Sequence, residues 1–209
     1  MDIDAVLLRI KGDIGKQIVF YDTVSSSNTV ALGLDNRADE GTVIIADSQE
    51  KGRGRFGRAW VSPPGANIYM SIILRPAVAA RHLTLLTILS AVACACALRG
   101  TTGLTVSVKW PNDLMSFDKK IGGILTEIRT IRNELPLAVV GIGVNVNMEG
   151  RDFPLSIRST ATSLMHETGR SFHRESIISE ILNEMDRWYK AFQAGLWQAI
   201  IAEWQRFSS

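Results

Sequence analysis

The segment at residues 51–65 restricts what this chain can fold into, because it excludes a familiar nucleotide-binding fold. The segment begins K-G-R-G-R-F-G-R-A-W and ends in Pro-Pro-Gly. Its glycines match the pattern G-x-G-x-x-G and follow a run, residues 42–48, that is typical of a strand. A dinucleotide-binding fold also needs a helix that opens at the third glycine, and Pro-Pro-Gly prevents that helix. The segment is therefore predicted to be a loop outside any dinucleotide-binding fold.

The first part of this segment, residues 51–60, carries four cations and is called the cationic loop below. A Walker loop would end in Gly-Lys-Ser/Thr, and a protein kinase would carry H-R-D and D-F-G, but the sequence contains none of these. Guanidinium and ammonium groups bind phosphate and carboxylate. The loop is predicted to be a mobile flap that orders over an anionic ligand, and a solvated basic loop is the alternative. The cations are Lys51, Arg53, Arg55 and Arg58.

The composition indicates a globular chain with localised positive charge. The chain has 209 residues, a hydrophobic content of 46% and a formal net charge of +2. These values suit one domain and do not indicate a broad nucleic-acid surface. The longest apolar run, residues 83–98, is shorter than the roughly 20 residues that span a bilayer. We expect a single domain over residues 1–209, in the cytoplasm, with neither DNA nor a membrane as a partner.

Hydrophobic periodicity predicts both strands and helices. Strands are predicted at residues 17–21, 42–48, 67–75, 106–110, 119–130 and 137–147. Helices are predicted at residues 2–13, 30–37 and 81–99, from residue 174 onward, and again beyond residue 197. The third helix is apolar nearly all round, so it is expected to be buried against a sheet. The predicted fold class is α+β, with a mixed central sheet, helices on one side and the ligand site on the other.

The last two predicted strands each carry glycine on one face. In the sixth strand, Gly141 and Gly143 share a face with Asn145. This small face suits the edge of a planar heterocycle, and a tightly packed strand with glycine bulges explains it equally well. In the fifth strand, the two-residue period places Lys120 and Gly122 on one face, together with the next even-numbered residues. Glycine beside lysine leaves space for a ligand next to the ammonium group.

Two polar clusters lie where predicted strands end. Ser26, Ser27 and Asn28 precede the second helix, and their side chains either cap that helix or face a ligand. Lys109 ends a strand, and residues 111–113 follow it as Pro-Asn-Asp, a turn sequence that places an amide and a carboxylate near the lysine. This second cluster is either an ordinary strand corner or part of a site.

Four segments together resemble a known family. G-R-G-R-F-G-R-A-W, K-W-P-N-D, K-K-I-G-G-I-L and G-I-G-V-N-V-N, in this order and spacing, closely resemble the bacterial biotin–protein ligases. S-S-S-N before the second helix and Gln49 before the loop also match, so the resemblance covers roughly residues 20–147. It implies a class II synthetase-like catalytic domain of the biotin/lipoate ligase type. Such a domain uses ATP and Mg²⁺ to form biotinyl-5′-AMP and then biotinylates a lysine of a biotin carboxyl carrier domain. Relatives also suggest a homodimer.

The resemblance implies roles for individual residues by their positions in the motifs. Catalysis is assigned to Lys120, Arg55 and Asp113, with Lys120 between the biotin carboxylate and the α-phosphate and Asp113 as the metal ligand. Biotin binding is assigned to Ser26, Ser27, Asn28, Gln49, Arg53, Gly54, Arg55 and Lys120. ATP binding is assigned to Arg53, Arg55, Arg58, Trp60, Lys109, Asn112 and Asn145, with Trp60 stacked on the adenine.

Some features depart from the family, and other interpretations compete. An N-terminal helix-turn-helix domain is expected to be missing, so no repressor function is predicted, and the C-terminal barrel of relatives is expected to be absent or truncated. Phe56 stands where many relatives have a basic residue. One rival is a lipoate–protein ligase or octanoyltransferase of the same fold, whose aliphatic substrate needs no ureido-binding side chains. A non-catalytic biotin- or nucleotide-binding protein is another. Localised charge without interleaved aromatic residues argues against RNA binding.

Overall fold

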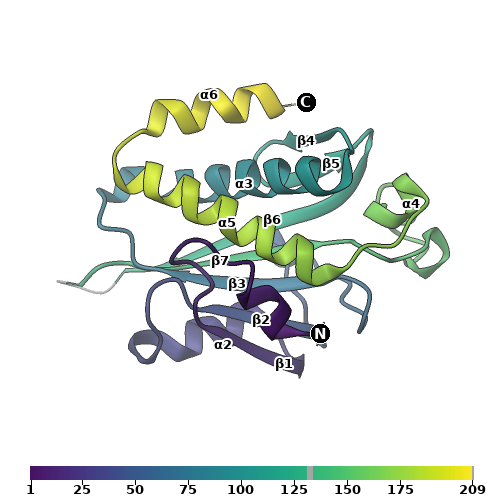
Figure 1. Cartoon of the computed structure of the whole chain (residues 1–209), viewed down its shortest axis with the longest axis horizontal. Helices are drawn as coiled ribbons and strands as arrows, with labels where there is room; N and C mark the ends of the chain where they lie inside the picture. Colours follow the sequence, from purple (N-terminus) through teal and green to yellow (C-terminus); the bar gives the residue numbers. More distant parts are fainter. Residues whose placement is uncertain (131–133, 209) are drawn as a thin grey trace.

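A seven-stranded mixed sheet organises the chain (Figure 1). The computed structural model describes residues 1–130 and 134–208. The strands lie in the order β1-β2-β3-β7-β6-β5-β4; β1 and β2 are parallel, and the other neighbouring pairs are antiparallel. Their bounds are β1 Ile18–Val24, β2 Val43–Gln49, β3 Ile68–Leu74, β4 Val106–Lys109, β5 Asp113–Ser116, β6 Lys119–Arg129 and β7 Leu137–Val144. The α+β class is confirmed, but β5 was missed because its first residue had been assigned to a turn.

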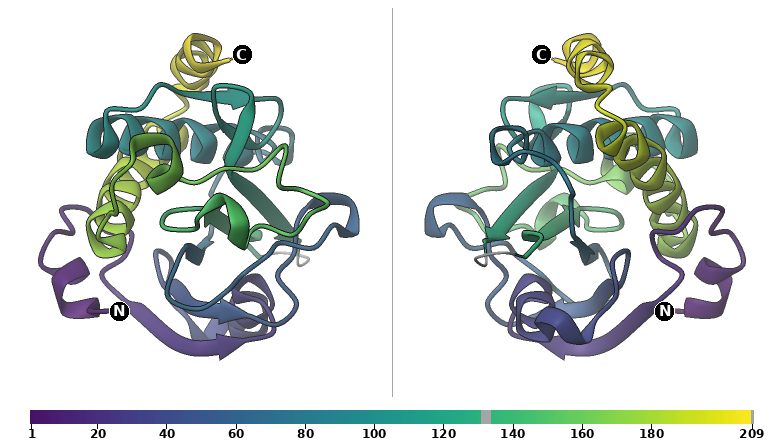
Figure 2. Two further views of the ribbon diagram at one scale, coloured as in Figure 1. Left: turned by 90° about the vertical axis from the view of Figure 1, so that its right-hand side faces the viewer. Right: turned by 90° about the vertical axis from the view of Figure 1, so that its left-hand side faces the viewer.

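The α-helices lie on both faces of this sheet. They are α1 Ile3–Leu7, α2 Ser27–Leu34, α3 Leu85–Thr102, α4 Leu164–Thr168, α5 Arg174–Gln193 and α6 Trp197–Phe207. Single 3₁₀ turns are η1 Asp35–Arg37, η2 Arg55–Gly57, η3 Ala80–His82 and η4 Gly150–Asp152. Figure 2 shows α6 at one end of the molecule, beyond α3, and β1 at the other end. The sheet therefore extends from β1 at one end toward α6 at the other.

The two faces of the sheet bury different sets of side chains. Val43 and Ile45 of β2 belong to the large core that includes residues of α3 and α5, whereas Ile44 between them packs with Ala31 of α2 in a smaller cluster. The alternation follows from the two-residue period of a strand. The prediction of helices on one side only is therefore wrong, because α2 covers part of the second face.

The helix α3 is apolar nearly all round because it is buried between the sheet and α5. With the residues that precede it, it is long and apolar enough to cross a membrane by length and composition alone. Most of its side chains belong instead to the large core, among them Leu86, Leu89 and Leu98, which are fully buried. A core helix of this kind needs no polar stripe, since water reaches little of its surface.

A β-bulge interrupts the pairing between β5 and β6. Leu114 of β5 pairs with Gly122 of β6, but the next residue, Met115, pairs with Lys120. Ile121 is therefore the extra residue that makes the bulge. A bulge of this kind shifts the alternation of side chains for every residue beyond it.

The bulge changes which residues of β6 lie beside Lys120. A Cβ on Gly123 would lie 3.3 Å from Lys120 Nζ, so Gly123 is the neighbour of the ammonium group. Ile124 belongs to the large core, and Thr126 hydrogen-bonds to a threonine of α3 at 2.9 Å. The prediction that Lys120 shares a face with Gly122 and the following even-numbered residues is therefore wrong. The two-residue period assumes an uninterrupted strand.

Candidate active site

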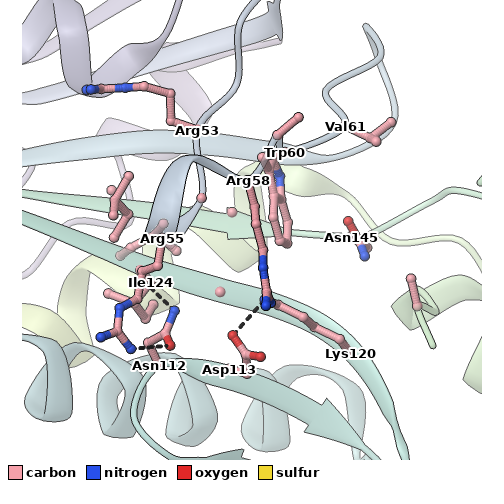
Figure 3. A pocket seen from close by; sticks show the side chains of 18 of the residues that line it. Arg53, Arg55, Arg58, Trp60, Val61, Asn112, Asp113, Lys120, Ile124 and Asn145 are labelled. Atoms are coloured by element: carbon pink, nitrogen blue, oxygen red, sulfur yellow. Dashed lines mark hydrogen bonds and ion pairs between the residues drawn. The ribbon is translucent and has the colours of Figure 1, made fainter. Parts of the chain in front are cut away.

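A cavity of about 520 Å³ opens on the α2 face of the sheet, between the cationic loop and the strands β6 and β7. Figure 3 shows it from close by, with the loop above the strands. Every residue to which the sequence analysis assigns a role lines this cavity. These residues are Ser26, Ser27, Asn28, Gln49, Arg53, Gly54, Arg55, Arg58, Trp60, Lys109, Asn112, Asp113, Lys120 and Asn145. The tertiary fold thus brings the residues together, while the role of each one stays a prediction.

The cationic loop folds back on itself over the cavity. The backbone N–H of Trp60 donates to Gly52 O at 2.9 Å, and the N–H of Gly54 donates to Arg58 O at 2.7 Å. A Cβ on Gly52 would lie 2.3 Å from Trp60 O, so only glycine allows the two backbone segments to approach this closely. Phe56 occupies the tip with a φ of 57° and is 86% exposed. The backbone of the loop therefore closes its base, and the tip projects outward.

One wall of the cavity is made of polar groups that connect α2 to β2. Ser27 donates to Gln49 Oε1 from its backbone N–H at 2.8 Å and from its Oγ at 3.2 Å. Gln49 Nε2 in turn donates to Ser62 Oγ at 3.0 Å. Ser26 is the N-cap residue of α2, but within the described residues its side chain makes no capping hydrogen bond. The capping interpretation of Ser26 is therefore not supported, and its side chain is one of those that line the cavity.

Besides Ser62, the sequence analysis missed Ser71 and Glu127 of this polar network. Ser71 of β3 is fully buried, and its Oγ lies 2.7 Å from Ser27 Oγ and 2.6 Å from Asn28 Oδ1. Glu127 of β6 accepts a hydrogen bond from Asn28 Nδ2 at 2.8 Å. A serine in an otherwise apolar strand is a signal that could have identified Ser71. Glu127 carried no such signal, because a glutamate near the end of a strand is usually an ordinary surface residue.

Gly141 and Gly143 of β7 leave room for two side chains that lie directly over the strand. A Cβ on Gly143 would lie 2.6 Å from Trp60 Cε2, and a Cβ on Gly141 would lie 2.2 Å from Asn28 Oδ1. Larger residues at either position would displace those groups. The small face of β7 therefore does lie in the site, and in this structure the protein's own indole and amide cover it.

Another part of the cavity contains a lysine–aspartate pair. Lys120 Nζ lies 2.6 Å from Asp113 Oδ1, and the two side chains are 33% and 31% exposed. The same Nζ lies 5.4 Å from the centre of the Trp60 ring, within range of a cation–π interaction. Arg58 enters this part of the cavity from the loop above (Figure 3). The aromatic ring, the ammonium group and the guanidinium group thus face a common space.

The other two arginines of the loop are held by polar partners in different places. Arg55 Nη1 donates to Asn112 Oδ1 at 3.1 Å. Arg53 Nη2 pairs with Glu127 Oε2 at 2.7 Å and points away from Lys120 (Figure 3). The cations that the sequence analysis groups around one set of phosphates therefore lie on different sides of the cavity.

Similarity to known sequences covers most of the chain. The family model described as "Biotin/lipoate A/B protein ligase family" matches residues 20–145. The bifunctional ligase/repressor BirA of Bacillus subtilis is 35% identical over 196 residues, which is 93% of this chain and 60% of that protein. The biotin–[acetyl-CoA-carboxylase] ligase of Mycobacterium tuberculosis is 32% identical over 166 residues, 78% of this chain and 59% of that protein. The chain therefore spans about three-fifths of the length of these relatives.

Similarity to a solved structure extends to the fold. The biotin protein ligase from Aquifex aeolicus, solved in complex with biotin and ATP, superposes with a TM-score of 0.80 at 29% sequence identity. The match covers 92% of this chain and 78% of that one. The sheet and its flanking helices thus have the architecture of that enzyme.

Proposed function

The chain belongs to the biotin/lipoate A/B protein ligase family, and on this premise we propose that it is the catalytic domain of a biotin–protein ligase. In this proposal the domain converts biotin and ATP to biotinyl-5′-AMP and pyrophosphate, and then transfers the biotinyl group to a lysine of a biotin carboxyl carrier domain. The observation that carries the proposal is one cavity that combines a wall of serine, asparagine and glutamine with a set of cations. The similarity to a protein solved with biotin and ATP supports it.

The polar wall suits the ureido ring of biotin. That ring is uncharged and presents two N–H donors and one carbonyl acceptor. Ser27, Asn28 and Gln49 supply hydroxyl and amide groups that can pair with both kinds of atom. An aliphatic substrate offers neither donor nor acceptor and would gain none of these hydrogen bonds. The wall therefore favours biotin over lipoate or octanoate.

The cations suit the joining of two anions. In the first step a carboxylate oxygen of biotin attacks the α-phosphorus of ATP, a P–O bond forms, and the bond to pyrophosphate breaks with its electron pair on the leaving group. Two unit charges about 4 Å apart repel by roughly 4 kcal/mol at an effective dielectric constant near 20. Lys120 between the two reactants offsets this repulsion and stabilises the charge that develops on the phosphate. Arg55 and Arg58 line the same cavity and serve the remaining phosphates.

The carboxylate of Asp113 fits the kind of Mg²⁺ site that accompanies ATP. Such an ion is held by one or two carboxylates together with phosphate oxygens and water, and not by an all-protein cage. Asp113 and Asp118 both line the cavity, and residues 1–130 and 134–208 contain no cluster of three or more His, Cys, Asp or Glu side chains suited to a metal. Mg²⁺ bound with ATP would neutralise part of the phosphate charge, and Asp113 would hold it.

The second step needs a cavity that excludes water until the acceptor arrives. The amine of the carrier lysine attacks the acyl carbon, an amide bond forms, and AMP leaves as the acyl–phosphate bond breaks. The mixed anhydride is prone to hydrolysis, and a loop that covers the cavity protects it. The name of the Mycobacterium tuberculosis relative, a biotin–[acetyl-CoA-carboxylase] ligase, supports a carboxylase as the source of the acceptor.

Exchange of labelled pyrophosphate into ATP tests this function. We expect exchange that requires both biotin and Mg²⁺ and that is lost when lipoate replaces biotin. Exchange with lipoate but not with biotin would instead identify a lipoate–protein ligase. Calorimetric binding of biotin without any exchange would identify a non-catalytic binding protein.

A further inference from the structure

One oxygen atom of Glu127 contacts two residues that line the cavity. Its Oε2 accepts a hydrogen bond from Asn28 Nδ2 at 2.8 Å and pairs with Arg53 Nη2 at 2.7 Å. Asn28 belongs to the first turn of α2, Arg53 to the cationic loop and Glu127 to β6. A single carboxylate thus links a helix, a loop and a strand that are far apart in the sequence.

The first consequence concerns the orientation of the Asn28 amide, whose two ends differ in chemistry. Ser71 Oγ lies 2.6 Å from Asn28 Oδ1, while Nδ2 donates to Leu125 O at 3.2 Å as well as to Glu127. A carboxylate only accepts hydrogen bonds, so Glu127 holds the NH₂ end toward β6. Asn28 is only 3% exposed. A flipped amide would therefore place its carbonyl oxygen against the carboxylate where little water can screen the repulsion.

The second consequence concerns Arg53. The pair with Glu127 keeps the guanidinium group beside Asn28 and away from Lys120 (Figure 3). Lys120 has its own partner, Asp113, at 2.6 Å. Arg53 and Lys120, which both line the cavity, therefore belong to two different ion pairs. One lies next to the polar wall, and the other lies next to the aromatic ring of Trp60.

We propose that Glu127 is a positioning residue for biotin binding. It holds the Asn28 amide in one orientation and keeps Arg53 beside the polar wall, so that the wall is ordered before biotin arrives. Preorganisation of this kind strengthens binding because less ordering is left to be done on association. The inference rests on the proposed ligase function and extends it to a residue that acts through Asn28 and Arg53.

Two substitutions at this position test the proposal. Glu127→Ala removes the acceptor, and we expect the KM for biotin to rise about tenfold, in line with the loss of one hydrogen bond to a charged group. The kcat and the KM for ATP should stay within about twofold, because the contact is made equally in the ground state and the transition state. Glu127→Gln keeps an oxygen that accepts from Asn28, so its KM for biotin should stay within about threefold of the unaltered protein. If Glu127 only supported the fold, Glu127→Ala would change kcat together with the KM for biotin. Glutamine at this position would then not restore the KM.

A measurement without ligand makes the test independent of catalysis. By NMR, the side-chain amide protons of Asn28 should be protected from solvent exchange in the unaltered protein and in Glu127→Gln, and should exchange faster in Glu127→Ala. Glu50→Ala, which removes an exposed carboxylate beside the cationic loop, is the matched control. It should change neither the KM for biotin nor the exchange rate of the Asn28 amide protons.

Two results would overturn the inference. One is a Glu127→Ala variant with unchanged amide protection and an unchanged KM for biotin. The other is equal impairment by alanine and glutamine, which would show that the orientation of Asn28 does not depend on an acceptor at this position. Lack of biotin-dependent exchange in the unaltered protein would count against the proposed function, and the NMR comparison would still decide whether Glu127 orders Asn28.

Discussion

At the scale of single residues, the partner of each cation decides where its side chain lies in the cavity. Lys120 lies against Asp113, and Arg53 lies against Glu127. Partly exposed pairs of this kind contribute typically about 0–1 kcal/mol to stability. Their effect on the site is geometric, because a phosphate or carboxylate that enters the cavity meets cations already held at its wall. Substitution of one of them is therefore expected to affect activity more than folding.

Lys120→Ala is expected to leave the fold intact and to lower the rate of adenylate formation by about 10²–10³, the typical loss when one preorganised charge-stabilising group is removed. Pyrophosphate exchange measures the rate, and thermal unfolding measures the fold. Lys119→Ala, which removes the neighbouring lysine on the opposite face of β6, is the control. Near-normal exchange in Lys120→Ala would remove this lysine from the mechanism.

Gly143→Ala is expected to destabilise the protein by about 1–3 kcal/mol, the usual cost of overpacking. The added Cβ would lie 2.6 Å from Trp60 Cε2, so the indole must leave β7. Denaturant unfolding measures the stability, and near-ultraviolet circular dichroism reports the movement of the indole. In the control, Gly150→Ala, the new Cβ would meet its nearest atom, His166 Cε1, at 3.5 Å, an ordinary contact. Equal stability of both variants would contradict this account of Gly143.

At the scale of elements, the cationic loop has a closed base and an exposed tip. The base is fixed by the hydrogen bond from Trp60 to Gly52 and by the indole on β7, whereas Phe56 at the tip is largely exposed. Segments with few buried apolar contacts open at low free-energy cost. We therefore expect the loop, and not the sheet, to change its degree of order between a free and a bound state.

We expect the backbone amides of residues 51–58 to exchange faster without ligand than with biotin bound, because an anionic ligand adds charge-assisted hydrogen bonds to those that the loop already makes. Hydrogen–deuterium exchange followed by mass spectrometry measures this difference. The amides of α3, which is buried in the core, serve as the internal reference and should not respond. Equal protection of the loop with and without biotin would show that it does not order over the ligand.

At the scale of the whole molecule, the N-terminal segment is tied to α5, far along the chain. Lys11 N donates to Asn183 Oδ1 at 2.9 Å, and Asp13 N donates to Asp186 Oδ1 at 2.7 Å. A Cβ on Gly12 would lie 2.1 Å from Asp186 Cγ, so only glycine fits between them. These contacts explain why the helix predicted at residues 2–13 ends at Leu7: side chains of α5 take the backbone N–H groups that a longer helix would use.

The acid dependence of stability should report on this attachment. Hydrogen bonds from Lys16 and then from Lys190 lower the pKa of Asp13 from 3.8 to about 2. Because the pKa is lower in the folded state, the contribution of Asp13 is present above pH 3.8 and is lost as the pH falls through about 2. We expect the denaturant midpoint of Asp13→Asn to depend less on pH over that window than the midpoint of the unaltered protein. Identical pH profiles would show that the pairs of Asp13 contribute nothing to folding.

Much of the fold and site was predictable because it depends on short stretches of chain. Strand and helix types follow from local periodicity, and the loop at residues 51–60 follows from glycines and prolines that no regular element accepts. The residues that line the cavity could be named because their motifs, in this order and spacing, resemble those of the bacterial biotin–protein ligases. The prediction that Gly141 and Gly143 share one face of β7 was also correct. That strand pairs without a bulge, so its period of two holds throughout.

What the sequence alone determined is therefore local: the elements, the motifs and the family to which they point. The tertiary structure alone decided the bulge at Ile121, the turn of Arg53 toward Glu127, and the buried link from Ser71 to Asn28. Each of these depends on contacts between segments that are distant along the chain. A periodic pattern carries no information about such contacts, because strand register and side-chain partners are set by the packing of the whole molecule.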